Sequence, residues 1–169
     1  PYFYYILTPF YLFAKGSPFA IIYFLVFNGI AFFVTSLIVL KKSFGNQIAL
    51  IFLGLWTVNT STVIMDKWPW NPTLIPLAVV CLIYLLYLYD LKRNNTLLFL
   101  MGLLFGLGFS LHVQFLLLFP ILLAFVRWSK RILLIIFGFL ITLTPIVVFD
   151  LKNNLLNFRL ALALIIKNV

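Results

Sequence analysis

The densest group of residues suited to chemistry is Asp66–Pro72, with the sequence Asp-Lys-Trp-Pro-Trp-Asn-Pro. The indoles of Trp68 and Trp70 offer faces on which a sugar ring can stack, and the ammonium of Lys67 can neutralise a phosphate. Two prolines within four residues make the stretch stiff and extended, and the second biases Asn71 away from helical conformation. The alternative is a pair of interfacial tryptophans followed by a proline at a helix start. The residue types alone leave both interpretations open.

His112 is the only histidine, so a metal site built from several histidines is excluded. Its ring could hydrogen-bond a phosphate or a sugar hydroxyl, or donate a proton. It could equally be a polar turn residue satisfied by the neighbouring backbone. Ser110 and Gln114 flank it and add further polar groups. The single cysteine, Cys81, lies in an apolar run and is expected to be a small hydrophobic residue, with no disulfide and no metal spacing around it.

Acidic residues are scarce, because the chain has three aspartates and no glutamate. Asp90 is expected on the cytoplasmic side, so only Asp66 and Asp150 could serve as a base or a metal ligand near the residues above. An enzyme that depends on carboxylates usually shows a clearer pair. No metal site is therefore assigned, and a divalent cation is left open. Either carboxylates are supplied from elsewhere, or the chain is not an enzyme.

The amino-acid composition indicates whether the chain is surrounded by water or by lipid. Hydrophobic residues make up 65% of its 169 residues and charged residues only 9%, whereas soluble domains average about 25% charged residues. A disordered tail, a disulfide-rich secreted domain and an ordinary cytosolic enzyme are excluded. The net charge of +9 would suggest nucleic acid only if the basic residues formed one exposed patch. They are scattered between apolar runs, so we expect an integral membrane protein with lipid and no nucleic acid around it.

Charged or polar breaks divide the chain into runs near the 20 residues that a transmembrane helix needs. One run, Leu97–Val126, is too long for a single untilted span, and we expect it to form two short helices that turn at Ser110–Gln114. The prediction is an all-α, polytopic transmembrane helical bundle of about six spans in one domain, residues 1–169. The other expected spans are Phe19–Leu40, Gln47–Met65, Thr73–Tyr89 and Ile132–Phe149.

The basic residues predict the orientation of these spans. Alternate connectors hold seven of the twelve positive charges, and positive residues of short loops stay on the cytoplasmic side. The opposite ends, which carry Asp66–Pro72, Ser110–Gln114 and Asp150, are then extracytoplasmic. Polar groups near membrane depth usually face a bundle interior or a wet cavity, so we expect one polar cavity that opens outward. The seven charges are Lys41, Lys42, Lys92, Arg93, Arg127, Lys130 and Arg131.

Both ends of the chain are expected to lie at the membrane interface. Seven of residues 1–13 are Phe or Tyr, a density that suits rings at the headgroup level. The segment Lys152–Val169 mixes Leu and Ile with polar residues and could also lead into another span. Within the bundle, Gly102 and Gly106 form a GxxxG pattern that predicts close packing of two helices.

Several motifs occur in an order that resembles the GT-C superfamily of glycosyltransferases, in the branch that contains protein O-mannosyltransferases and the aminoarabinose transferase of lipid A. Each motif is weak alone, and the ordered set covers nearly the whole chain. The motifs are Pro1, Tyr4, Tyr5, Pro9, Phe10 and Tyr11 with Gly16-Ser17-Pro18; Lys41-Lys42 before Phe44-Gly45; Trp68–Pro72; Gly102–His112; and Pro145–Asn154.

The resemblance implies transfer of a sugar from a polyprenyl-phosphate donor to a glycan, lipid or protein acceptor at the extracytoplasmic face. An acidic residue of the first outer loop would act as base, with inversion at the anomeric carbon. That loop would lie upstream of Pro1, so we expect a longer protein and leave the catalytic base unassigned. A multi-pass protein of a prokaryotic plasma membrane is implied. The expected substrate-binding residues are Asp66, Lys67, Trp68, Trp70, Asn71, His112, Gln114 and Asp150.

Two other classes of protein remain open. A transporter or flippase for a lipid or small polar solute would also suit proline-containing spans and a one-sided polar cavity. A transporter should show several polar groups near the middle of the membrane. Asn28 is the main candidate at that depth, and the scarcity of such polar groups favours the enzyme. A noncatalytic membrane subunit would fit the missing carboxylate pair.

Overall fold

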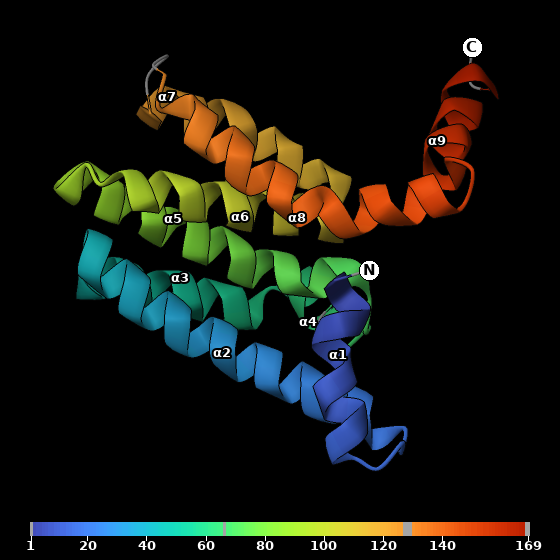
Figure 1. The fold of residues 1–169 in the computed structure, drawn as a ribbon. Coiled ribbons are helices and arrows are strands. Elements are labelled where there is room, and N and C mark those ends of the chain that lie inside the picture. Colours follow the sequence, from blue (N-terminus) through green and yellow to red (C-terminus); the bar gives the residue numbers. More distant parts are fainter. Residues whose placement is uncertain (1, 66, 127–129, 168–169) are drawn as a thin grey trace.

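The computed structural model describes residues 2–65, 67–126 and 130–167, and all of its regular elements there are helical (Figure 1). The predicted all-α class is confirmed. In chain order the elements are α1 (Tyr2–Phe13), α2 (Phe19–Phe44), α3 (Asn46–Val58), α4 (Thr60–Met65), the 3₁₀ helix η1 (Asn71–Leu74), α5 (Ile75–Lys92), α6 (Asn95–Leu111), the 3₁₀ helix η2 (Val113–Leu118), α7 (Phe119–Val126), α8 (Ile132–Lys152) and α9 (Leu156–Lys167).

Within the described ranges, three helices are long and apolar enough to cross a membrane: α2, the continuous helix η1–α5 and α8. The other three expected spans are shorter. The run Gln47–Met65 is interrupted at Asn59, whose backbone is extended (φ −74°, ψ 107°) and separates α3 from α4. The run Leu97–Val126 is interrupted at His112, so neither half reaches the length of α2. A membrane protein is therefore supported by three long apolar helices.

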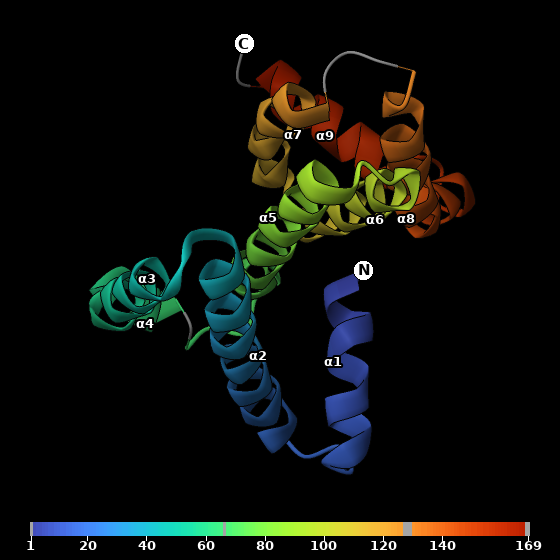
Figure 2. The same cartoon turned by 90° about the vertical axis from the view of Figure 1, so that its left-hand side faces the viewer.

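Most of the helices run back and forth along one direction (Figure 1). The α2–α3 and α5–α6 connectors lie at one end, together with the end of α7 and the beginning of α8. The α4–η1, α6–η2 and α8–α9 connectors lie at the opposite end, which also carries α1 and α9, both running across the other helices. Figure 2 shows α5 in the middle, with α3 and α4 on one side of the molecule and α6, α7 and α8 on the other.

Helices α6 and α8 pack at backbone distance. A Cβ on Gly102 would overlap the backbone of Ile135, and Gly138 of α8 returns the contact because its Cβ would overlap the carbonyl of Phe99. Gly106 likewise has no room for a side chain. The predicted packing role of Gly102 and Gly106 is confirmed, and Gly138 is the partner on the facing helix.

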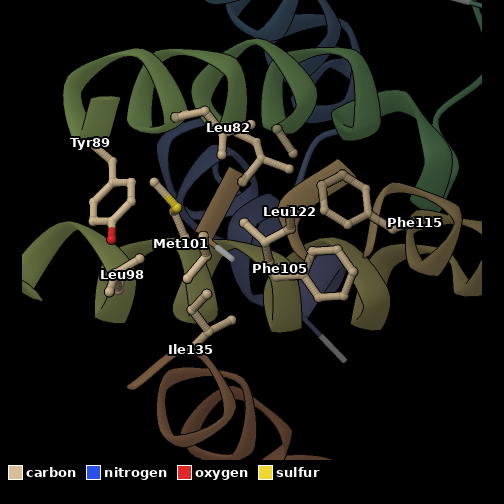
Figure 3. Packing of buried hydrophobic residues seen from close by; sticks show 11 residues of the cluster. Leu82, Tyr89, Leu98, Met101, Phe105, Phe115, Leu122 and Ile135 are labelled. Carbon is tan, nitrogen blue, oxygen red and sulfur yellow. The ribbon is translucent and has the colours of Figure 1, made fainter. Parts of the chain in front are cut away.

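The main apolar core lies between α5, α6, η2, α7 and α8 (Figure 3). Phe115 of η2 is 3% exposed, and its ring packs on the bare backbone of Gly108 and against Phe105, with ring centroids 5.4 Å apart. This contact turns the chain back after α6 and so fixes the position of His112. The most deeply buried members of the core are Tyr89, Leu98, Met101, Phe105 and Leu122.

A second apolar cluster attaches α1 to the bundle. Phe3 of α1 packs edge-on against Phe24 of α2, with ring centroids 5.6 Å apart, and Leu111 at the end of α6 joins them. The Tyr2 hydroxyl donates a hydrogen bond of 2.7 Å to the backbone carbonyl of Thr142. Burial, and then the neighbouring Tyr5, raise the pKa of Tyr2 above its usual value. The aromatic segment therefore forms a helix that packs with one face against the bundle and exposes Tyr4 and Tyr5 on its surface.

Asn28 joins α2 to the beginning of the η1–α5 helix. Its side chain is 7% exposed, and Nδ2 donates a hydrogen bond of 3.1 Å to the carbonyl oxygen of Thr73. Buried amides are normally paired in this way, because an unpaired polar group is costly away from water. The donor of this candidate for a transporter's polar group thus has a structural partner, whereas its Oδ1 is buried without a hydrogen-bond partner among the described residues.

Candidate functional site

The segment that carries Trp70 is held by the side chain of Thr73. The Thr73 hydroxyl donates to the carbonyl of Trp68 at 2.8 Å and accepts from the amide of Trp70 at 3.4 Å, and the Thr73 amide donates to the Trp70 carbonyl at 3.0 Å. Trp70 is extended (φ −132°, ψ 167°), and Pro72 lies in the first turn of η1. The predicted extended approach to the helix is confirmed at Trp70. The expectation that Pro72 keeps Asn71 out of helical conformation is wrong, because Asn71 is the first residue of η1.

His112 occupies the turn between α6 and η2 in extended conformation (φ −157°, ψ 128°). Its Nδ1 accepts a hydrogen bond of 3.3 Å from the amide of Gln114, so the ring caps η2. A ring nitrogen that accepts in this way carries no proton, and the proton of the ring therefore lies on Nε2. The predicted turn at Ser110–Gln114 is confirmed, and the Nε2–H group remains as a hydrogen-bond donor.

Two cavities of about 520 and 530 Å³ share the residues Trp70, Pro72 and His112. The first cavity also has Gln114 in its wall, between apolar residues of α5 and η2. The second cavity lies against α1 and has Asn71 in its wall. The shared residues belong to segments that the sequence separates widely, and the two apolar clusters bring them together. The remaining walls are Trp56, Ser61, Thr73, Ile75, Pro76, Val79, Phe115, Leu117 and Leu118 in the first cavity, and Phe3, Tyr4, Leu7, Tyr11, Ile21, Pro69 and Leu111 in the second.

Trp56 is a residue of the first cavity that the sequence analysis did not single out. Its ring packs on Phe32, with centroids 4.5 Å apart, and its Nε1–H group is buried without a hydrogen-bond partner among the described residues. A buried donor without a partner is unfavourable by about 1 to 3 kcal/mol. A ligand that accepts this hydrogen bond would remove that penalty. The available signal was a tryptophan five residues before Ser61, in a run that otherwise reads as apolar.

The structure gathers Trp70, Asn71, His112 and Gln114 around the two cavities. Lys67 and Trp68 precede them and are exposed, Trp68 by 65%, and neither is a lining residue of these cavities. Asp66, and Arg127 among the basic connector residues, lie outside the described residues.

Asp150 lies at the end of α8 and holds the beginning of α9. Its Oδ1 accepts a hydrogen bond of 2.9 Å from the amide of Asn157, and its Oδ2 accepts one of 3.3 Å from the amide of Phe158. Both amides belong to the first turn of α9, where backbone donors have no partner inside the helix. The carboxylate is thus engaged in a helix cap, and it is not a lining residue of the two cavities.

Asp150→Ala is expected to loosen the first turn of α9 by about 1 kcal/mol, because two amides lose their acceptor. Amide hydrogen exchange should become about fivefold faster at Asn157 and Phe158. The control is Asp90→Ala, since Asp90 pairs with Arg93 at the other end of the bundle and should leave this exchange unchanged. Unchanged exchange in Asp150→Ala would contradict the cap.

The two cavities offer aromatic faces and hydrogen-bond donors. Their lining contains no carboxylate within the part of the chain that the structure describes. No group of three or more His, Cys, Asp or Glu that could hold a metal occurs in residues 2–65, 67–126 and 130–167. Such a site can bind and orient a ligand with an anionic head and hydroxyl groups. Comparison of the chain with protein-family models, with curated proteins and with solved structures finds no match.

Proposed function

We propose that this chain belongs to an integral membrane glycosyltransferase and that the two cavities with shared lining residues bind a polyprenyl-phosphate sugar at the extracytoplasmic end of the bundle. The observation that carries the proposal is that Trp70 and His112 line the same cavities. Each was selected from the sequence for its chemistry, and the two share the walls of both cavities. The ordered motifs that resemble the GT-C superfamily support the same reaction.

The walls of the first cavity suit a donor that has a polar head on an apolar chain. Leu117, Leu118 and Val79 offer an aliphatic surface beside the polar groups of His112 and Gln114. We assign the indole face of Trp70 to the sugar and the Nε2–H group of His112 to a phosphate oxygen. Lys67 is exposed a few residues before Trp70, and its long flexible side chain can approach the same phosphate.

The proposed topology keeps six crossings. Beside the three long apolar helices, the pair α3 and α4, the helix α6 and the pair η2 and α7 would each cross as a short span, which local thinning of the bilayer accommodates. The basic connectors would be cytoplasmic under the positive-inside rule. Helices α1 and α9 run across the bundle at the opposite end, as interfacial helices would. A prokaryotic plasma membrane follows from the resemblance.

The proposal gives these residues donor binding and positioning. In the reaction, the carboxylate of an acidic residue acts as the base and removes the proton of the acceptor hydroxyl. The acceptor oxygen then bonds to the anomeric carbon, and the bond between that carbon and the phosphate oxygen breaks. The negative charge that develops on the leaving phosphate would be stabilised by the His112 donor. The base is not assigned to the described residues, because none that lines the two cavities is a carboxylate. The same observation favours a second candidate, a noncatalytic subunit that binds the donor.

Trp70→Ala is expected to weaken binding of a polyprenyl-phosphate sugar about fivefold to tenfold, because the ring loses its contact with the sugar. The full-length protein in lipid vesicles, with a radiolabelled donor, provides the measurement. Trp68→Ala is the matched comparison, since Trp68 is the same residue type and more exposed, 65% against 45%. An equal loss in the two variants, or no loss in Trp70→Ala, would contradict the site. Binding without transfer to any acceptor would favour the noncatalytic subunit.

A further inference from the structure

A third cavity of about 520 Å³ lies between α2, α5, α6 and α8, and shares no lining residue with the cavities at Trp70 and His112. Its walls are almost entirely apolar. They include Val39 of α2, Cys81 and Leu85 of α5, and Leu103 and Leu104 of α6. We call this cavity the α2–α5–α6 groove.

A lysine stands at one end of this groove. Thr35 and Val39 of α2 line it, and Lys42 follows them at a spacing that keeps the three residues on one face of the helix. The Nζ of Lys42 lies 3.3 Å from the hydroxyl of Tyr84, a lining residue, and 5.6 Å from the centroid of its ring. An apolar groove thus ends at an ammonium and a phenol hydroxyl.

The charge of Lys42 is not balanced by a described carboxylate. Asp90 forms an ion pair with Arg93, and Asp150 caps α9 at the other end of the bundle. The groove end therefore combines an unbalanced positive charge with a hydroxyl donor. This pairing is complementary to a phosphate diester, and the apolar walls are complementary to an acyl chain.

We propose that the α2–α5–α6 groove binds an anionic phospholipid of the cytoplasmic leaflet, with an acyl chain against Leu103 and Leu104 and the phosphate beside the Lys42 ammonium and the Tyr84 hydroxyl, accepting hydrogen bonds from both. From Thr35 to Lys42 the groove follows α2 for about 10 Å at the rise of an α-helix. That length fits within one leaflet, because the whole hydrocarbon core is about 30 Å thick. Basic pockets between helices on the cytoplasmic side favour anionic headgroups.

The test is native mass spectrometry of the full-length protein in detergent, with equal amounts of phosphatidylglycerol and phosphatidylcholine of identical acyl chains. We expect phosphatidylglycerol to be retained about fivefold more often, and Lys42→Gln to remove the preference. The matched control is Lys152→Gln, which removes a lysine at the opposite end of the bundle and should keep it. Tyr84→Phe keeps the ring and removes the hydroxyl, and should lower the preference even if Lys42→Gln fails to fold.

A second measurement locates the acyl chain. Cys81 lines the groove and is the only cysteine of the sequence, so its alkylation by a maleimide reports on groove occupancy. Phosphatidylglycerol should slow this alkylation severalfold, and phosphatidylcholine should not. Equal retention of the two lipids, an unchanged preference in Lys42→Gln, or alkylation that phosphatidylglycerol does not slow would each overturn the proposal. Equal retention would point to neutral lipid or another protein segment as the cover of the groove.

Discussion

Gly138→Val is expected to disrupt the contact between α6 and α8 and to lower the free energy of unfolding markedly. A Cβ at Gly138 would overlap the carbonyl oxygen of Phe99 and lie 2.8 Å from the amide nitrogen of Leu103. These are backbone atoms of the facing helix, which cannot turn aside as a side chain can. Overpacking of a close contact destabilises a protein by about 1 to 3 kcal/mol, and we expect the upper end of that range because valine is branched at Cβ. Such a loss is a large part of a stability of about 5 to 15 kcal/mol.

Gly54→Val provides the matched control, because a Cβ at Gly54 would meet no atom within 4 Å. The fraction of monodisperse protein after heating, measured by size-exclusion chromatography, should fall sharply for Gly138→Val. For Gly54→Val this fraction should stay close to that of the parent, because the free energy of unfolding should change by no more than about 0.5 kcal/mol, as for an ordinary surface change. A similar fall in both variants would show that the helix pair α6–α8 is not the sensitive contact.

The second large effect is expected at His112, where one ring has two roles. His112→Asn keeps a side-chain acceptor for the amide of Gln114, since asparagine is a favoured helix cap, but it removes the Nε2–H donor. A hydrogen bond to a charged group contributes about 1.5 to 3 kcal/mol, so the dissociation constant of a polyprenyl-phosphate sugar should rise about 10-fold to 100-fold. His112→Ala also removes the cap, which lowers stability by about 1 kcal/mol and should weaken binding further.

The pair of His112 variants separates the ligand contact from the structural one. Thermal unfolding should place His112→Asn near the parent and His112→Ala below it, whereas donor binding in vesicles should be impaired in both. Parent-like binding by His112→Asn would show that the histidine only caps η2. That result would contradict the proposed phosphate contact and would leave the turn and the helix cap unaffected.

Several helix boundaries were predictable because they depend on local composition. The predicted start of the first long span at Phe19 is confirmed. The helix continues to Phe44, one turn beyond the predicted end, because lysines near a helix C-terminus are favoured by the helix dipole and their long side chains reach water. The turn at His112 was predictable from the length of the run that contains it. The interruption at Asn59 was not, since a polar residue near a span end is also compatible with a continuous helix.

The site was predictable only residue by residue. Trp70 and His112 stood out because tryptophan beside proline and a lone histidine are unusual in an apolar chain. Trp56 did not stand out, because its neighbours in the sequence are apolar and most of the other residues that line its cavity lie in other helices. Asp150 was expected to face the same cavity from its position at a span end, and its actual hydrogen bonds depend on how the chain turns between α8 and α9.

The sequence by itself determined that this protein is helical, that several of its helices are apolar enough to cross a membrane and where most of its helices begin and end. These properties follow from the length and polarity of consecutive residues, which each segment carries alone. The tertiary structure decided that Gly138 faces Phe99, that Trp70 and His112 line the same cavities and that Lys42 contacts Tyr84. Helices that are apolar on every face carry no hydropathy signal for their rotation, because lipid solvates any face equally well. Their pairing is determined by shape and by a few polar contacts, and these exist only once the helices lie side by side.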